Sequence, residues 1–159
     1  MSDIHSLVVD IGRKAREASR RLAVASSLQK KDALSFGADS IRENTAKILE
    51  QNKKDLDFGA SKGLSNALMD RLLLNEERID SMINGLQAIA NQDDPIGEIM
   101  QAWRRPNGLE IKRVRTPLGV IGVIYESRPN VTSDAGALCL KAGNAVILRG
   151  GSESYNSSI

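Results

Sequence analysis

Two short segments near the end of the sequence carry residue types that bind phosphates and nucleotides. Tyr125–Asn130 reads Tyr-Glu-Ser-Arg-Pro-Asn, and Arg149–Glu153 reads Arg-Gly-Gly-Ser-Glu. Arginine offers a fork of donors that matches a phosphate, and glycine lets a backbone come close to a ligand. The free N–H groups and the dipole at the start of a helix also favour an anion. The two segments therefore indicate a nucleotide site.

Spacing leaves a second interpretation open. Neither segment has the glycine pattern of a dinucleotide-binding or Walker motif. The glycines could serve only to form tight turns, with Arg149 in a surface ion pair. The residue types alone do not decide between a ligand site and a structural turn.

A strand–helix–strand unit is predicted to position the two segments. Val120–Tyr125 is an almost continuous apolar run, as expected of a strand buried on both faces. Ala145–Leu148 is the expected second strand, parallel to the first. Ligands of open α/β sheets bind at the carboxyl ends of the strands, so both segments would meet at one edge.

The connecting helix is predicted over Val131–Ala142. Thr132 or Ser133 is the expected N-cap, and Gly143 the expected C-terminal cap. The fold class that follows is α/β, with a parallel-sheet, Rossmann-like cofactor domain.

The region before this unit has helical periodicity. Apolar residues recur every three or four positions from Ile4 to Ala25 and again from Leu34 to Leu49, which indicates two helices. A short helix is expected over Asn52–Lys62, closed by Gly63.

One more long helix precedes a change of period. Asn75 is its expected N-cap, and Asp93-Asp94-Pro95 its expected end. Its apolar stripe is formed by Ile79, Met82, Ile83, Leu86 and Ile89.

Ile96–Arg115 is predicted to form a β-hairpin. Arg105-Pro106-Asn107-Gly108 suits a type I turn, because proline takes the second position and glycine the fourth. The alternation of apolar residues slips after Ile111, which indicates a bulge near Lys112-Arg113.

Composition excludes several classes of protein. The 159 residues include 22 basic and 20 acidic side chains, which gives a net charge of +2. Because this excess of positive charge is small, no nucleic-acid partner is expected. One cysteine excludes a disulfide framework, and no metal site is predicted. The N-terminus has no secretory signal pattern, and no apolar run is long enough for a membrane span, so a cytoplasmic protein is expected.

Longer strings around the two segments resemble one known family. They are Thr116–Thr132, Leu138–Lys141 and Gly143–Glu153, and Asn52–Asp55 and Asp70–Leu74 also match. The resemblance is to the gamma-glutamyl phosphate reductases, the glutamate-5-semialdehyde dehydrogenases of proline biosynthesis, in the aldehyde dehydrogenase superfamily. It covers essentially the whole chain.

The resemblance implies an activity. Members of the family reduce L-glutamyl 5-phosphate with NADPH and yield L-glutamate 5-semialdehyde, phosphate and NADP. A cysteine thiolate attacks the acyl phosphate, phosphate leaves, and hydride from the cofactor reduces the thioester. The implied partner is this small-molecule substrate, and the full-length enzyme is expected to be a homo-oligomer.

The resemblance also implies a domain plan. Residues 1–95 would be the helical N-terminal part of the cofactor domain, and residues 96–115 the hairpin of an oligomerisation element. Residues 116–159 would be the truncated βαβ unit of the NADP-binding domain. The catalytic domain, with its nucleophilic cysteine, is expected to be absent from this chain.

Family positions assign roles to residues of the two segments. Asn130 matches an asparagine that helps to hold the thioester oxyanion. Arg149 takes the place of a lysine that contacts the adenosine ribose, and its fork could pair with the 2′-phosphate of NADP. Arg128 could recognise a carboxylate or phosphate of the substrate, or form a structural ion pair. The predicted cofactor-binding residues are Tyr125, Glu126, Ser127, Arg149, Gly150, Gly151, Ser152 and Glu153.

Other reactive or charged residues are given plainer roles. Cys139 is expected to be buried and inert, and His5 to be a solvated surface residue. The basic run from Arg13 to Arg21 is expected to be a solvated helix face, because aromatic residues for stacking on nucleic acid are lacking. Trp103 is expected to pack under the hairpin or at a subunit contact.

Three hypotheses about function follow. The first is the N-terminal portion of a gamma-glutamyl phosphate reductase. The second is a catalytically inactive, truncated cofactor-binding module that lacks the nucleophilic cysteine. The third is an interaction protein whose hairpin pairs with another chain and whose turns bind nothing.

Overall fold

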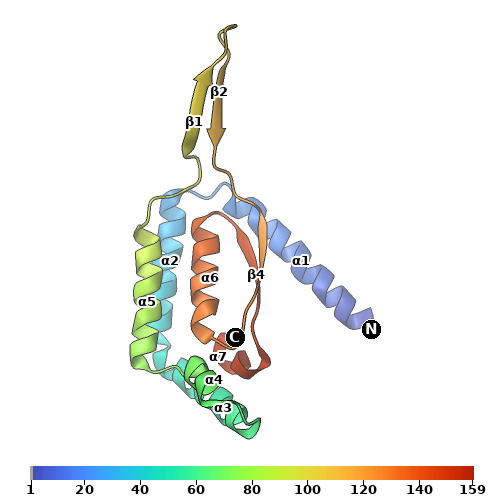
Figure 1. The fold of residues 1–159 in the computed structure, drawn as a ribbon, viewed down its shortest axis with the longest axis vertical. Coiled ribbons are helices and arrows are strands. Elements are labelled where there is room, and N and C mark those ends of the chain that lie inside the picture. Colours follow the sequence, from blue (N-terminus) through green and yellow to red (C-terminus); the bar gives the residue numbers. More distant parts are fainter. Residues whose placement is uncertain (1) are drawn as a thin grey trace.

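Three helices that pack side by side form the core of the molecule (Figure 1). The computed structural model describes residues 2–159, so Met1 lies outside the described part. Helices α2, α5 and α6 bury apolar residues against one another. The elements are α1 (Ser2–Leu22), α2 (Ser27–Glu43), α3 (Thr45–Ser61), α4 (Asn66–Leu72), α5 (Glu76–Asn91), β1 (Ile99–Arg104), β2 (Glu110–Val114), β3 (Val120–Ile124), α6 (Pro129–Lys141), β4 (Ala145–Arg149), the 3-10 turn η1 (Ser152–Ser154) and α7 (Tyr155–Ser158).

The predicted stripe of α5 is the centre of this core. All five of its predicted apolar residues are buried. Asn75 caps the helix as predicted, since its Oδ1 accepts a hydrogen bond from Arg78 N at 2.8 Å. The buried apolar cluster consists of Leu34, Ala38, Ile79, Ile83, Leu86, Ile89, Ala90 and Ala137.

The helical boundaries between residues 27 and 72 differ from the prediction. The second helix ends at Glu43, and α3 runs from Thr45 to Ser61 instead of starting near Asn52. The break falls at Asn44, whose Nδ2 donates to the Ser40 carbonyl. A side chain that competes for backbone partners in this way favours a helix end. The prediction also missed α4, which Ser65 caps.

The hairpin of β1 and β2 projects from one end of the helical layer (Figure 1). Its turn is as predicted, with Gly108 N donating to the Arg105 carbonyl at 2.9 Å and Gly108 at φ +86°. The bulge was placed on the wrong strand. Ile99 pairs with Val114 and Gln101 with Arg113, so the extra residue is Met100 in β1.

Strands β3 and β4 form the predicted parallel pair, with Val120 opposite Ala145 and Ile124 opposite Arg149. The prediction that the first strand is buried on both faces is wrong. Burial alternates along β3, and the Ile124 side chain is 81% exposed. Each of the two strands has only one strand neighbour within residues 2–159, which leaves part of the sheet surface open.

Helix α6 begins two residues before its predicted start. Pro129 occupies its first turn, where a missing N–H costs nothing, and Arg128 is the N-cap residue. Thr132 and Ser133 therefore lie within the first turns instead of capping them. Gly143 ends the helix as predicted, at φ +69°.

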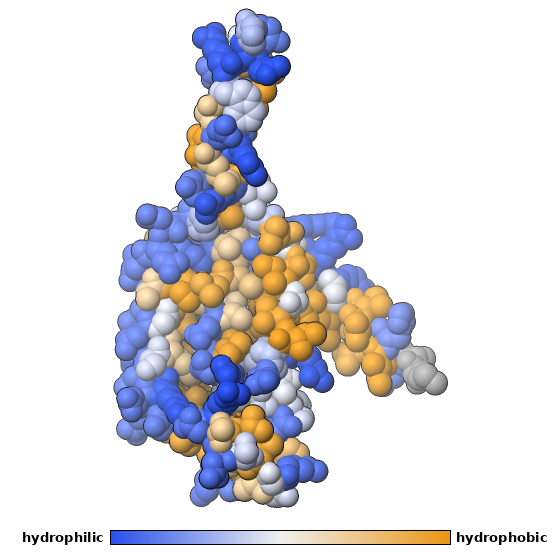
Figure 2. Space-filling model, in the orientation of Figure 1, coloured by the Kyte–Doolittle hydropathy of each residue, from blue (hydrophilic) through white to orange (hydrophobic). Residues whose placement is uncertain are grey.

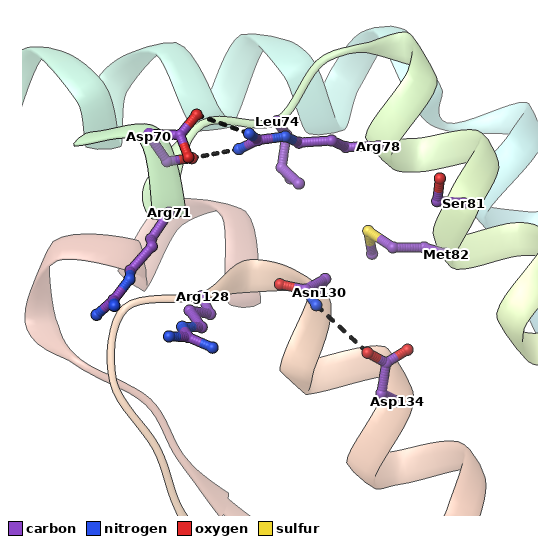
Figure 3. Close-up of a pocket in the computed structure, with 9 residues that line it drawn as sticks. All are labelled: Asp70, Arg71, Leu74, Arg78, Ser81, Met82, Arg128, Asn130 and Asp134. Carbon is purple, nitrogen blue, oxygen red and sulfur yellow. Dashed lines mark hydrogen bonds and ion pairs between the residues drawn. The ribbon is translucent and has the colours of Figure 1, made fainter. Parts of the chain in front are cut away.

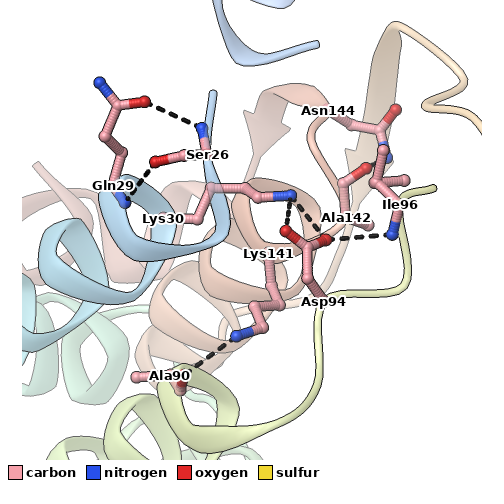
Figure 4. Close-up of polar contacts among 9 residues, drawn as sticks. All are labelled: Ser26, Gln29, Lys30, Ala90, Asp94, Ile96, Lys141, Ala142 and Asn144. Atoms are coloured by element: carbon pink, nitrogen blue, oxygen red, sulfur yellow. Dashed lines mark hydrogen bonds and ion pairs between the residues drawn. The ribbon is translucent and has the colours of Figure 1, made fainter. Parts of the chain in front are cut away.

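A buried ionic contact links α2 to the segment that follows α5 (Figure 4). The Lys30 ammonium lies 2.6 Å from an Asp94 carboxylate oxygen, and Asp94 also accepts from Ile96 N at 3.0 Å. Lys141 of α6 donates to the Ala90 carbonyl at 2.9 Å. These contacts fix the ends of the three core helices where the chain enters the hairpin.

Candidate functional site

The carboxyl ends of β3 and β4 meet at one edge, as predicted for a ligand site. Tyr125 N donates to the Arg149 carbonyl at 3.1 Å, which continues the parallel pairing to the last residue of β4. From this point the first turn leads into α6 and the second into η1 and α7. The two segments are therefore adjacent in space as well as similar in residue types.

Ser127 and Glu153 join the two turns. The Ser127 hydroxyl donates to Glu153 Oε2 at 2.6 Å, and the Ser152 hydroxyl donates to Oε1 at 3.1 Å. The Ser127 hydrogen bond is the main cause of a lowered Glu153 pKa, because it stabilises the ionised form. Glu153 therefore presents a carboxylate held in place by two hydroxyl groups.

The structure shows why the second turn contains two glycines, which the sequence did not reveal. A Cβ on Gly151 would overlap the Ser127 hydroxyl and lie 2.8 Å from Glu153 Oε2. A Cβ on Gly150 would lie 3.2 Å from the ring of Tyr125. The space that side chains would need is thus filled by the first turn. The glycines bring the turns together, whether or not they also face a ligand.

Tyr125 lies between the second turn and α6. Its hydroxyl oxygen is 2.7 Å from Thr132 Oγ1, so the ring spans from the end of β3 to the second turn of α6. The Thr132 hydroxyl, inside the helix, therefore contacts Tyr125. Tyr125 is half-buried, and its ring packs against Gly150 of the second turn.

Three predicted cofactor-binding residues are exposed at this edge: Glu126, Arg149 and Ser152. Glu126 forms an ion pair with Arg71 of α4 at 3.3 Å. The Arg149 side chain has no hydrogen-bond or ion-pair partner within residues 2–159, and its charge helps to lower the Glu153 pKa. Arg149 is therefore free to bind an anion.

Arg128 and Asn130 face a different part of the molecule. They line a cavity of about 420 Å³ between α4, α5 and the start of α6 (Figure 3). No other predicted site residue lines it. Asn130 Nδ2 donates to Asp134 Oδ2 at a long 3.3 Å. The structure thus divides the predicted site into a strand-edge part and a cavity part, and Arg71 on the cavity wall pairs with Glu126 of the strand-edge part.

Sequence reasoning missed the polar anchors of the second turn, although it had noted their segment as a family string. The Asp55 carboxylate of α3 accepts hydrogen bonds from Asn156 N at 3.0 Å and from Ser157 N at 2.8 Å. Both side chains also donate to it. The buried Asp55 carboxylate lies at the N-terminus of α7, and it holds α7 and the second turn against α3.

Asn52, one turn before Asp55, organises the α4–α5 connection. Its Nδ2 donates to the Leu72 carbonyl and its Oδ1 accepts from Leu74 N, both at 2.8 Å. The buried Asn52 amide therefore satisfies one backbone carbonyl and one backbone N–H of this connection, so its role is structural. The Asn-x-x-Asp spacing on one helix face was the only signal in the sequence that could have suggested these roles.

The only cysteine of the sequence lies on α6 and is buried. Burial raises the pKa of the Cys139 thiol, because the charged thiolate loses solvation. A thiol in this state is a weak nucleophile, as the sequence predicted. Among residues 2–159, no helix has both the length and the apolar character needed to cross a bilayer.

Comparison with known proteins identifies the relatives of the chain. No protein-family model matches it. It is 58% identical over 156 residues to the gamma-glutamyl phosphate reductase of Rhodospirillum rubrum, and the match covers 98% of this chain and 36% of the relative. The chain therefore spans about a third of the length of this relative.

Solved structures agree with this result. The gamma-glutamyl phosphate reductase of Thermotoga maritima superposes with a TM-score of 0.92 at 43% identity, over 94% of this chain and 36% of that one. An NAD-dependent benzaldehyde dehydrogenase from Corynebacterium glutamicum superposes with a TM-score of 0.69 at 21% identity, over 91% of this chain and 29% of that one. At that identity the likeness shows the fold alone. The resemblance found in the sequence is thereby confirmed: this chain is similar in sequence and fold to a part of the gamma-glutamyl phosphate reductases, and its fold matches part of the aldehyde dehydrogenase fold.

Proposed function

We propose that this chain forms the cofactor-binding part of an NADPH-dependent gamma-glutamyl phosphate reductase. The whole enzyme would reduce L-glutamyl 5-phosphate to L-glutamate 5-semialdehyde, with release of phosphate, in L-proline biosynthesis. The similarity to the Rhodospirillum rubrum reductase over 98% of the chain carries the proposal. The meeting of two polar turns at the carboxyl edge of β3 and β4 supports it.

The residues at this edge fit a phosphorylated dinucleotide. Arg149 is exposed and unpaired among the described residues, so it can bind the 2′-phosphate of NADP through its guanidinium fork. The ordered Glu153 carboxylate and the Ser152 hydroxyl offer hydrogen-bond partners for a ribose hydroxyl. When bound, NADPH supplies the hydride that converts the acyl group to an aldehyde.

Asn130 is proposed to act on the acyl oxygen of the substrate. Its side-chain amide is exposed at the first turn of α6 and is held only by the long contact to Asp134. That amide can turn to donate a hydrogen bond to an oxyanion, which stabilises the developing negative charge. Asn130 also lies on the cavity wall.

Arg149 is tested in a protein that contains this sequence together with the part that the relatives also possess. Arg149→Ala should weaken binding of NADP about tenfold to a hundredfold, the range for a lost hydrogen bond to a charged group, and weaken NAD much less. Arg42→Ala on α2, far from both turns in sequence, is the matched control and should change neither. Dissociation constants from fluorescence titration measure the effect. Equal losses for NADP and NAD would exclude a 2′-phosphate role.

We also propose that the 159 residues catalyse no turnover by themselves. The buried Cys139, with its raised thiol pKa, is a poor nucleophile, and the sequence contains no other cysteine. The 159-residue chain with NADP, phosphate and glutamate semialdehyde should produce no NADPH. Robust activity that persists in Cys139→Ser would show that no further cysteine is required.

A further inference from the structure

The cavity lined by Arg128 and Asn130 contains a charge pattern that the proposed function does not yet use. Its wall carries three arginines, Arg71, Arg78 and Arg128, and two carboxylates, Asp70 and Asp134 (Figure 3). Leu74 and Met82 supply apolar surface. A cavity with a few convergent charged groups and an apolar floor is typical of a small-molecule site.

Two of the five charged groups already have structural partners. Arg78 donates to the Leu73 carbonyl at 2.8 Å, to the Asp70 carbonyl and to Asp70 Oδ1 at 2.7 Å. The Arg78 guanidinium links the end of α4 to the start of α5, and the charges of Arg78 and Asp70 neutralise each other. Arg71 is engaged more loosely, through its exposed ion pair with Glu126.

The other two charged groups are not matched by protein. The Arg128 guanidinium makes no hydrogen bond or ion pair within residues 2–159. Asp134 accepts only from the neutral Asn130 amide, at 3.3 Å, and no described cation pairs with it. The cavity therefore presents one unpaired cation and one unpaired anion, both placed by the first turns of α6.

We infer that this cavity is the subsite for the α-amino-acid head of the substrate, with Arg128 binding the α-carboxylate and Asp134 the α-ammonium group. The inference rests on the proposed function, because it takes the reacting carbonyl to lie at Asn130. Asn130 lines the same cavity. A substrate whose carbonyl lies at the Asn130 amide and whose carbon chain extends into the cavity would bring its amino-acid head toward Arg128 and Asp134. An unpaired cation and anion together match a zwitterion better than they match a lone phosphate.

Substrates that lack one charged group separate the two contacts. In the full reductase that contains this sequence, the aldehyde would be oxidised with NADP and phosphate, and the KM of each aldehyde would be measured. Glutamate semialdehyde carries both charges, 5-oxopentanoate lacks the ammonium group, and 4-aminobutanal lacks the carboxylate. Concentrations refer to the open-chain aldehyde in each case.

Each variant should affect only substrates that carry the matching charge. Arg128→Gln should raise the KM of glutamate semialdehyde and of 5-oxopentanoate about tenfold to a hundredfold, and leave that of 4-aminobutanal nearly unchanged. Asp134→Asn should raise the KM of glutamate semialdehyde and of 4-aminobutanal by a similar factor, and leave that of 5-oxopentanoate nearly unchanged. Arg42→Gln on α2 and Asp80→Asn on α5 are charge-matched controls outside the cavity and should change none of these values.

The outcomes separate this inference from the proposed function. Equal losses on all three aldehydes would show that Arg128 and Asp134 only support the fold, and would overturn the subsite. A raised KM for phosphate in Arg128→Gln, with the aldehydes unchanged, would assign the cavity to the phosphate and would also overturn it. A parent protein with no activity on glutamate semialdehyde would refute the proposed function itself.

Discussion

At the scale of single residues, the candidate cofactor edge depends on close packing between two turns. Gly151 lies against Ser127 and Glu153, and its backbone, at φ −68° and ψ 157°, is one that any residue can adopt. Glycine is required here by space and not by backbone conformation. The contact also orders the Glu153 carboxylate, because the Ser127 hydroxyl holds it.

Gly151→Ala should therefore destabilise the protein and separate the turns. Forcing one methyl group into filled space costs about 1–3 kcal/mol of the free energy of unfolding. Gly136→Ala in α6 is the control, since no atom lies within 4 Å of the added Cβ. It should stabilise the helix by about 0.5–1 kcal/mol, because alanine has the higher helix propensity. Urea denaturation measures both, and equal stability of the two variants would contradict the packing argument.

At the scale of elements, the three core helices are held in register by apolar packing and by one buried ion pair. Burial opposes ionisation of Asp94, but hydrogen bonds from Lys30 and from Ile96 N and the charge of Lys141 outweigh it and lower the Asp94 pKa. The Lys30 side chain is only 2% exposed. Removal of its partner would leave an uncompensated buried charge.

The ion pair predicts how stability depends on pH. Because the Asp94 pKa is lower in the folded protein, its contribution is present above the unfolded pKa of about 4 and is lost as the pH falls through the folded pKa. Asp94→Asn should therefore lower the free energy of unfolding by about 3 kcal/mol at pH 7. The difference from the parent protein should shrink as the pH falls below about 4.

An exposed pair provides the control for that experiment. Asp39 pairs with Arg42 at 2.7 Å on the surface of α2, and both side chains are more than half exposed. Asp39→Asn should cost less than about 1 kcal/mol, because water screens exposed charges. Chemical denaturation from pH 7 to pH 2 would measure the two variants. A pH-independent penalty for Asp94→Asn would rule out the ionised carboxylate as its cause.

At the scale of the whole molecule, apolar surface remains uncovered in residues 2–159. Helix α1 extends away from the three core helices (Figure 1), and apolar side chains gather on it and over the neighbouring strand region (Figure 2). Ile4 and Val8 are more than 60% exposed. Continuous apolar surface of this kind marks a contact face, and strands with one neighbour leave an open edge.

The isolated 159-residue chain is therefore expected to oligomerise or aggregate. Val8→Glu, which places a charge in the apolar stripe of α1, should shift the population toward the monomer. Val24→Glu is the control, because Val24 is exposed in the loop after α1 and lies outside the helix. Light scattering at several concentrations would measure the mass. A sharp monomeric species that unfolds cooperatively in the parent chain would contradict the expectation.

The sequence predicted the elements that depend on local interactions. The α5 stripe, the Asn75 cap and the hairpin turn follow from periodicity, side-chain caps and turn residues, which act over a few positions. The parallel pairing of β3 and β4 follows from the strand–helix–strand order. Some of its errors are helix boundaries, at Asn44, in the missed α4 and at the start of α6. The others concern residues on a neighbouring strand or surface. The bulge was assigned to β2 because alternation in one strand does not reveal an extra residue in its partner. The exposure of β3 depends on which elements pack against it in space, and the apolar residues of the strand do not indicate those elements.

The candidate site divides in the same way. The sequence by itself determined the family resemblance, the two turn segments and the residue types available to bind a nucleotide, because each of these is written in contiguous residues. Only the tertiary structure decided that Gly151 is packed against Ser127, and that Asp55 anchors the second turn from α3. It alone placed Arg128 and Asp134 on the cavity that α4 and α5 complete. Those relations join residues that are up to about a hundred positions apart, and packing between elements creates them.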